Sequence, residues 1–417
     1  MRKSLFKILL FNFKETKNII ISITTTLVVC MIFLQIMHNP YLKIEAHNIS
    51  DIFIIPTLIL GIFIISSLIM TYSVGFYMKQ NSKELGLIRM AGYDLKKTIS
   101  YYSLKISVIY IIALILSIII SLLFITFIQA LLYKLVAIKG EILFISLNAV
   151  NEAICVVMLI LFVILFYQLM YINQTSISDL LKDNSIVIYK RNTRKYGLQL
   201  RNEFYIMMYF IGLILIIKSE FSGGVVIPSC LGAIGAYELF NKVFPSIFKK
   251  NIKINKTNKD QYILYGDLSL LMQQSKTTVL FILIVQIVMP ILIIVMNSNT
   301  LAFYVYNLAY LLFNILLSVC LSKWLSTDYY NKKNHFKKLY ALGFTKSHIQ
   351  YIVRKYICLY YLILLGIISI YLFASTLAIL KLSSYYLIYI IIIGLECYIP
   401  FLIALLVDER RIRREEF

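Results

Sequence analysis

The chain has 417 residues, of which 60% are hydrophobic and 15% are charged, and its mean hydropathy is +0.82. Soluble domains are about 45–50% apolar and about 25% charged, so this composition excludes an ordinary soluble protein. The formal net charge of +21 alone would suit a nucleic-acid-binding protein. The basic residues, however, lie between long apolar runs, and this pattern indicates a membrane protein with no nucleic-acid partner.

Residues 1–17 form the first predicted element, an amphipathic helix on the inner leaflet of the membrane. Its apolar residues recur at helical spacing with lysines between them: Leu5, Phe6, Leu9, Leu10 and Phe13. No small-residue cleavage site follows, which argues against a signal peptide.

Ten predicted membrane spans follow, most of them near the roughly 20 residues that cross a bilayer. They cover residues 18–37, 52–78, 106–127, 149–172, 204–218, 224–244, 278–297, 301–322, 357–378 and 385–407. The fifth is the shortest. An even number of spans places both termini on one side of the membrane, and the arginines near the C-terminus make that side cytoplasmic.

The basic residues support this topology. All but five of the 41 Lys and Arg residues fall on the cytoplasmic side, and the exceptions are Lys43, Lys134, Lys139, Lys218 and Lys381. This asymmetry follows the positive-inside rule for a multi-pass protein of the cell membrane. The basic face should also attract anionic lipid headgroups, so membrane lipids are expected partners.

The domain organisation follows from these elements. Residues 18–172 form a first half with four spans, and residues 173–256 form a cytoplasmic linker with spans five and six. Residues 257–407 form a second half, an amphipathic helix and four spans, before a charged tail over residues 408–417. The outer loops are too short to fold as domains with cores of their own.

An internal repeat relates the two halves. The segment after the second span ends a charged amphipathic stretch at Gly92, and the segment after the eighth span ends a similar stretch at Gly343. Each glycine is followed by an aromatic residue and a hydrophilic helix start. Glycine readily takes the left-handed conformation that ends many helices, and Asp94 or Thr345 can cap the next helix. The prediction is a helix-turn-helix elbow in each half, although one copy alone would also fit a solvated basic loop.

Other chemistry-bearing residues are sparse. The six cysteines lie inside apolar runs, the four histidines are scattered, and we expect no metal site and no catalytic residue. Glu396 falls near the middle of the tenth span, where a charged carboxylate costs about 2.5–3.5 kcal/mol. It is therefore either a neutral acid bonded to a neighbouring helix or a residue that contacts a cationic substrate or takes part in gating.

The first elbow resembles that of the FtsX-like permease family of ABC transporters, which has the form R-x-K-E-I-x-x-L-R-x-L-G. The matching segment is Ser82-Lys83-Glu84-Leu85-Gly86-Leu87-Ile88-Arg89-Met90-Ala91-Gly92, and a more diverged copy runs from Lys337 to Gly343. The ten-span layout and residues 177–182 are similar to the bacitracin-resistance (BceB-like) branch. The resemblance implies an all-α polytopic fold of two FtsX-like halves whose elbows are cytoplasmic coupling helices.

The resemblance also implies a permease subunit that binds two copies of a separate ABC ATPase. The residues carried over as ATPase-coupling elements are Glu84, Gly86, Arg89, Gly92, Lys338 and Gly343. The chain has no G-x-x-x-x-G-K-[ST] phosphate loop, so we expect no enzyme activity of its own and place ATP and Mg in the partner.

The chain departs from the family in one respect. Relatives carry a large extracellular domain between spans seven and eight or between spans one and two, whereas those loops are short here. The expected role is export or membrane extraction of an amphipathic substrate in antimicrobial peptide resistance, with a peptide and a sensor histidine kinase as further candidate partners. The alternative is a non-transporting regulator that, like FtsX in cell division, transmits ATPase cycling to a partner protein.

Overall fold

The computed structural model describes residues 13–42, 49–136, 145–175, 202–218, 226–254, 259–295, 300–380 and 386–414. Those residues are helical throughout apart from turns and caps, and they contain no strand, so the predicted all-α polytopic membrane fold is confirmed. Of the amphipathic helix predicted over residues 1–17, residues 1–12 lie outside the described residues, whereas residues 13–17 are helical. The segment over residues 177–182 also lies outside the described residues. The described parts form two compact units, Met1–Lys190 and Arg191–Phe417.

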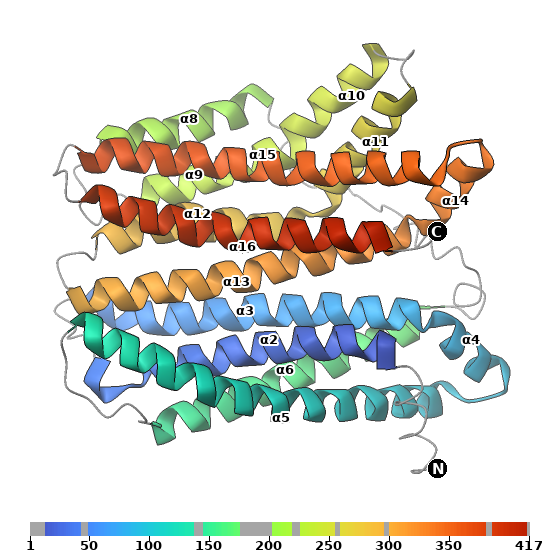
Figure 1. Ribbon diagram of the computed structural model, residues 1–417, viewed down its shortest axis with the longest axis horizontal. Helices are drawn as coiled ribbons and strands as arrows, with labels where there is room; N and C mark the ends of the chain where they lie inside the picture. Colours follow the sequence, from blue (N-terminus) through green and yellow to red (C-terminus); the bar gives the residue numbers. More distant parts are fainter. Residues whose placement is uncertain are drawn as a thin grey trace. The chain divides into compact units, whose positions relative to one another are not determined.

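The first unit is a bundle of four long helices with one short helix at its end (Figure 1). The helices are α2 (Phe13–Met37), α3 (Ile49–Gln80), α4 (Ser82–Met90), α5 (Leu95–Val136) and α6 (Leu147–Gln174). Helix α2 packs against α3, α5 and α6, and its inward face is built from buried aliphatic side chains such as Ile23 and Leu27. Helix α4 lies beyond the bundle, between the end of α3 and the start of α5.

The second unit repeats this order of elements. It contains α12 (Lys276–Val295), α13 (Thr300–Asn331), α14 (Lys333–Ala341), α15 (Lys346–Leu380) and α16 (Tyr386–Arg414). Helix α13 packs against α12 and α16, and α15 packs against α16, α12 and the additional helices of this unit. Helix α16 continues through Arg414, so the start of the predicted tail at residue 408 is helical.

Four further helices precede this repeat. They are α8 (Asn202–Lys218), α9 (Val226–Glu238), α10 (Phe244–Ile254) and α11 (Lys259–Gln274), and a π-helical turn, η3 (Leu239–Val243), joins α9 to α10 without a break. Helices α10 and α11 pack against each other, and α11 also packs on α15 (Figure 1).

Eight helices in the described residues are long and apolar enough to cross a membrane, and they correspond to predicted spans one to four and seven to ten. The ten-span count is not confirmed. Helix α8, with 17 residues, and α9, with 13, fall short of the length of a span when each is taken alone.

Helices α8, α9 and α15 are tied together by close backbone contact and two tyrosines. A Cβ atom added to Gly212 of α8 would lie 2.7 Å from the Gly232 Cα of α9, so only glycines permit this approach. The Tyr371 hydroxyl of α15 donates to the Tyr209 carbonyl of α8 at 2.9 Å, and the Tyr209 hydroxyl donates back to the Ile367 carbonyl at 3.3 Å. These bonds are reciprocal, which fixes α8 along α15.

Candidate functional site: the two elbows

Each predicted elbow forms a helix, a left-handed glycine and a second helix. We define the first elbow as residues 82–97 and the second elbow as residues 333–348. Gly92 has a φ of 84° and Gly343 a φ of 96°, so the predicted left-handed glycines are confirmed. A side chain at either position would be strained, because L-residues rarely adopt this conformation.

The two glycines end their helices with the same hydrogen bonds. The Gly92 N–H donates to the Arg89 carbonyl at 3.2 Å, and the N–H of the next residue, Tyr93, donates to the Ile88 carbonyl at 3.4 Å. The corresponding distances are 3.0 Å from Gly343 to Tyr340 and 3.2 Å from Phe344 to Leu339. This is a Schellman motif in both copies, and the aromatic residue after glycine occupies the position that usually makes an apolar contact with the helix.

The helix that follows each glycine also starts at an equivalent position. The Asp94 carbonyl accepts the first helical bond of α5 from the Thr98 N–H at 3.0 Å, and the Thr345 carbonyl accepts that of α15 from the Ile349 N–H at 3.1 Å. Asp94 and Thr345 therefore occupy the N-cap positions that the sequence predicted. The backbone of the elbow is the same in both halves.

A buried ion pair fixes the first elbow to its bundle. The Lys105 Nζ of α5 lies 3.1 Å from the Glu84 Oε2 of α4, and the Lys105 side chain is only 1% exposed. The same ammonium group lies 5.7 Å from the Tyr77 ring centroid and 5.5 Å from that of Tyr102, within cation–π range. Glu84, predicted as a coupling residue, thus holds α4 against α5.

Two more predicted residues of the first elbow face the protein. Gly86 is buried, and the Arg89 guanidinium donates to the Thr175 carbonyl at 2.7 Å. Thr175 is the C-cap of α6, where carbonyl groups without helical partners favour a positive charge. Arg89 therefore ties the elbow to the end of α6.

A different set of charges fixes the second elbow. The Lys332 Nζ lies 2.9 Å from Asp328 Oδ2 and 4.0 Å from Asp267 Oδ1, and it lies 5.2 Å from the Tyr356 ring centroid. The His335 Nε2 lies 3.9 Å from Asp267 Oδ2. Burial raises the pKa of the Asp267 carboxyl above its usual range, although Lys332 and His335 act in the opposite direction.

The charged contacts that hold the two elbows lie at equivalent positions of the repeat, but different residues make them in each copy. With Gly92 aligned to Gly343, Lys105 corresponds to Tyr356 and Asn81 to Lys332. In both elbows a largely buried lysine lies beside aromatic rings and a carboxylate, yet the lysine comes from α5 in one copy and from the α13–α14 junction in the other. The sequence analysis missed Lys105, Asp267, Asp328 and Lys332. Lys105, a lone charge at the edge of an apolar run, was the one available signal.

The remaining predicted coupling residues lie at the surface. Lys338 is exposed on α14, and Gly92 and Gly343 are exposed at the tips of the elbows. Large apolar side chains are exposed beside them: Leu87 is 59% exposed, Met90 60%, Tyr340 63% and Leu342 76%. Exposed apolar side chains clustered at the end of a bundle are typical of a protein-binding surface.

Glu396 lies on α16 beside a polar group of residues in the second unit. Its Oε2 is buried and has no hydrogen-bond partner among the described residues, and the Tyr310 hydroxyl of α13 lies in its neighbourhood. That hydroxyl donates to Gln286 Oε1 of α12 at 2.5 Å, and the Gln286 amide donates in turn to Asn314 Oδ1. Glu396 thus lies close to this polar group, and its predicted role in helix packing, substrate contact or gating stays a prediction.

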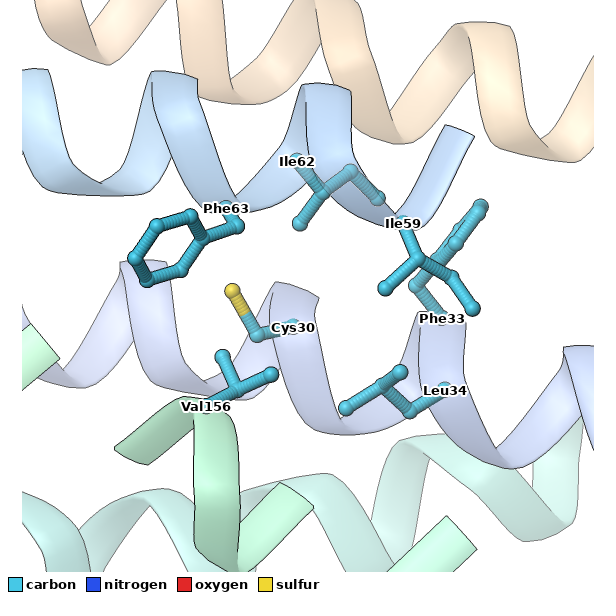
Figure 2. Close-up of a pocket in the computed structure, with 7 residues that line it drawn as sticks. All are labelled: Cys30, Phe33, Leu34, Ile59, Ile62, Phe63 and Val156. Atoms are coloured by element: carbon cyan, nitrogen blue, oxygen red, sulfur yellow. The ribbon is translucent and has the colours of Figure 1, made fainter. Parts of the chain in front are cut away.

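An apolar pocket in the first unit offers little chemistry. It lies between α2, α3 and α6 and is lined by Cys30, Phe33, Leu34, Ile59, Ile62, Phe63 and Val156 (Figure 2). The only polar group in this lining, the Cys30 thiol, lies 3.0 Å from the Ser66 hydroxyl. Within the described ranges no group of His, Cys, Asp and Glu side chains could hold a metal ion.

Residues 56–177 match the family model of the FtsX-like permease C-terminal domain. The match begins in α3, contains the first elbow and α5, and ends just beyond α6, so the matched segment spans most of the first unit. It covers under a third of the chain and supports the FtsX-like family. No curated protein matches the chain.

Proposed function

We propose that the chain is the permease subunit of an ABC transporter and that its two elbows dock on two copies of a separate ATPase. The observation that carries this proposal is the elbow itself, present twice with the same Schellman motif, once inside the FtsX-like match. A repeated, rigidly anchored element with exposed apolar side chains suits a docking device better than it suits a solvated loop.

The lengths of the helices support docking outside the membrane. Helices α3 and α13 have 32 residues each, α5 has 42 and α15 has 35. At 1.5 Å per residue these helices are about 48–63 Å long, whereas the hydrocarbon core is about 30 Å thick. Their ends project beyond the bilayer, and each elbow sits at such an end.

The number of membrane spans and the side on which the termini lie belong to the same proposal. The unbroken helical run from α9 through η3 to α10 and its glycine-mediated contact with α8 support a pair of additional membrane helices. With that pair the chain has ten spans, both termini lie in the cytoplasm, and the layout resembles that of the BceB-like branch. Antimicrobial peptide resistance is the proposed role, and it rests on this resemblance.

One experiment tests the docking proposal directly. The chain is co-expressed with the ABC ATPase encoded nearest to its gene, purified through a tag on the chain, and assayed for bound ATPase and for ATP hydrolysis. We expect two ATPase chains per permease and hydrolysis only in the complex. ATP hydrolysis by the purified chain alone, or the absence of ATPase from the preparation, would contradict the assignment.

Glu396 is proposed to act in substrate contact or gating. Glu396→Gln keeps the shape of the side chain and much of its hydrogen bonding, so thermal stability should stay within about 1 kcal/mol of the wild type. A gating role predicts a several-fold change in transport or peptide resistance in this variant. If activity instead follows the amount of folded protein, both in this variant and in Glu396→Leu, the side chain serves only helix packing, for which about 0.6 kcal/mol per polar contact is typical.

A further inference from the structure

The two elbows share a backbone but present different surfaces. On α4 the exposed side chains include Lys83, Leu87 and Met90, which lie one and two turns apart on one face. The residue of α14 equivalent to Leu87 is Lys338, and it is also exposed. A large apolar side chain in the centre of one docking face is thus replaced by a lysine in the other.

The surrounding charges enlarge this difference. The first elbow contains three lysines and one arginine together with Glu84 and Asp94. The second elbow contains four lysines, Lys333, Lys337, Lys338 and Lys346, and no Asp or Glu. With four basic and two acidic residues the first elbow has a formal charge of +2, whereas the second elbow, with four lysines, has a formal charge of +4 when its histidines are taken as neutral.

The carboxylates near the second elbow are already engaged. Asp328 and Asp267 face Lys332, and Asp260 of α11 lies 2.9 Å from the His348 Nε2. Within the part of the chain that the structure describes, no ion pair involves Lys337 or Lys338. Their charge is therefore available to a partner.

A protein partner fits this surface better than a lipid headgroup does. The second elbow lies at the ends of α13 and α15, which are about 48 and 52 Å long and extend past the hydrocarbon core. Tyr340 and Leu342 are exposed beside Lys338, and apolar side chains that project into water are expected at a protein interface.

We propose that the partner binds the two elbows through different kinds of interaction. The partner surface at the second elbow is acidic and pairs with Lys337 and Lys338. The partner surface at the first elbow is apolar and packs on Leu87 and Met90. This inference rests on the proposed docking of an ATPase. Two copies of one ATPase meet both requirements if its docking groove has an apolar floor and an acidic rim, and each elbow then relies on a different part of that groove.

Two substitutions, one in each elbow, test the proposal. The full chain is placed in nanodiscs of neutral phosphatidylcholine, and its affinity for the co-purifying ATPase is measured in about 0.1 M and about 1 M salt, where the screening length falls from about 10 Å to about 3 Å. Lys338→Leu should weaken binding up to about fivefold at low salt and flatten its salt dependence. Leu87→Ala should weaken binding by a similar factor at both salt concentrations. Lys249→Leu on α10, with the same change of charge at an exposed residue outside both elbows, is the matched control.

The outcomes separate this inference from the docking proposal. If the wild-type chain binds no ATPase, the docking proposal fails, and the inference fails with it. If the wild type binds but Lys338→Leu and Leu87→Ala show the same salt dependence, docking stands and the difference between the elbows is overturned. An effect of Lys338→Leu that arises only when anionic lipid is added to the nanodisc would show that the second elbow binds headgroups, and this too would overturn the proposal.

Discussion

Replacing Gly92 by proline is expected to reduce ATPase binding by about tenfold or more while the helical bundle stays folded. The proline ring holds φ near −65°, whereas Gly92 has a φ of 84°, and proline also removes the N–H that donates to Arg89. The chain must then leave α4 in another direction, which changes the orientation of α4 relative to α5. The measurement is the amount of ATPase bound per purified permease, with thermal unfolding of the permease recorded in parallel.

Two milder substitutions provide the controls. Asparagine tolerates the left-handed region, and a Cβ at Gly92 would have no heavy atom within 4 Å, so Gly92→Asn should bind nearly as well as the wild type. Gly92→Ala should fall between the two, because the left-handed region costs alanine about 1–2 kcal/mol. Gly343, with the same geometry, should show the same order. Normal ATPase binding by both proline variants would remove the elbows from the docking interface.

The second large effect is expected at the Glu84–Lys105 pair. Glu84→Gln leaves the Lys105 ammonium group buried without its carboxylate and should lower the free energy of unfolding by about 3 kcal/mol. That value is the lower end for a broken buried pair, since the rings of Tyr77 and Tyr102 still face the ammonium group. Denaturant or thermal unfolding of the purified permease measures the loss.

The two partners should not be equivalent in this test. Lys105→Met is expected to cost less than Glu84→Gln, because the Glu84 side chain is 30% exposed and can stay hydrated. The double variant should recover part of the loss, since it buries no unpaired charge. Equal stability of Glu84→Gln and the wild type would show that the pair does not hold α4.

Features with a local cause could be predicted from the sequence. Eight spans follow from the length of apolar runs, and the conformation of Gly92 and Gly343 follows from a charged helix that must end before a second helix begins. The aromatic residue after each glycine also has a local cause, the Schellman motif. These predictions needed only the spacing of residues within one turn or one helix.

The anchors of the elbows could not be predicted in this way. Lys105 meets Glu84 only because α4 folds back along α5, and Lys332 meets Asp267 only because α11 packs beside the second elbow. The two copies moreover use different residues at equivalent positions, so the repeat itself did not reveal the pairing. Such contacts depend on tertiary packing and leave little trace in a single sequence.

The tyrosine contacts along α15 connect the second elbow, where this helix starts, to helices α8 and α9. Helix α15 starts at the second elbow, and Tyr371, about 25 residues or 38 Å further along, is bonded to the backbone of α8. Helix α8 is in turn held against α9 at Gly212 and Gly232. A tilt imposed on the second elbow should therefore be transmitted along α15 to α8 and α9, over a distance greater than the thickness of the hydrocarbon core.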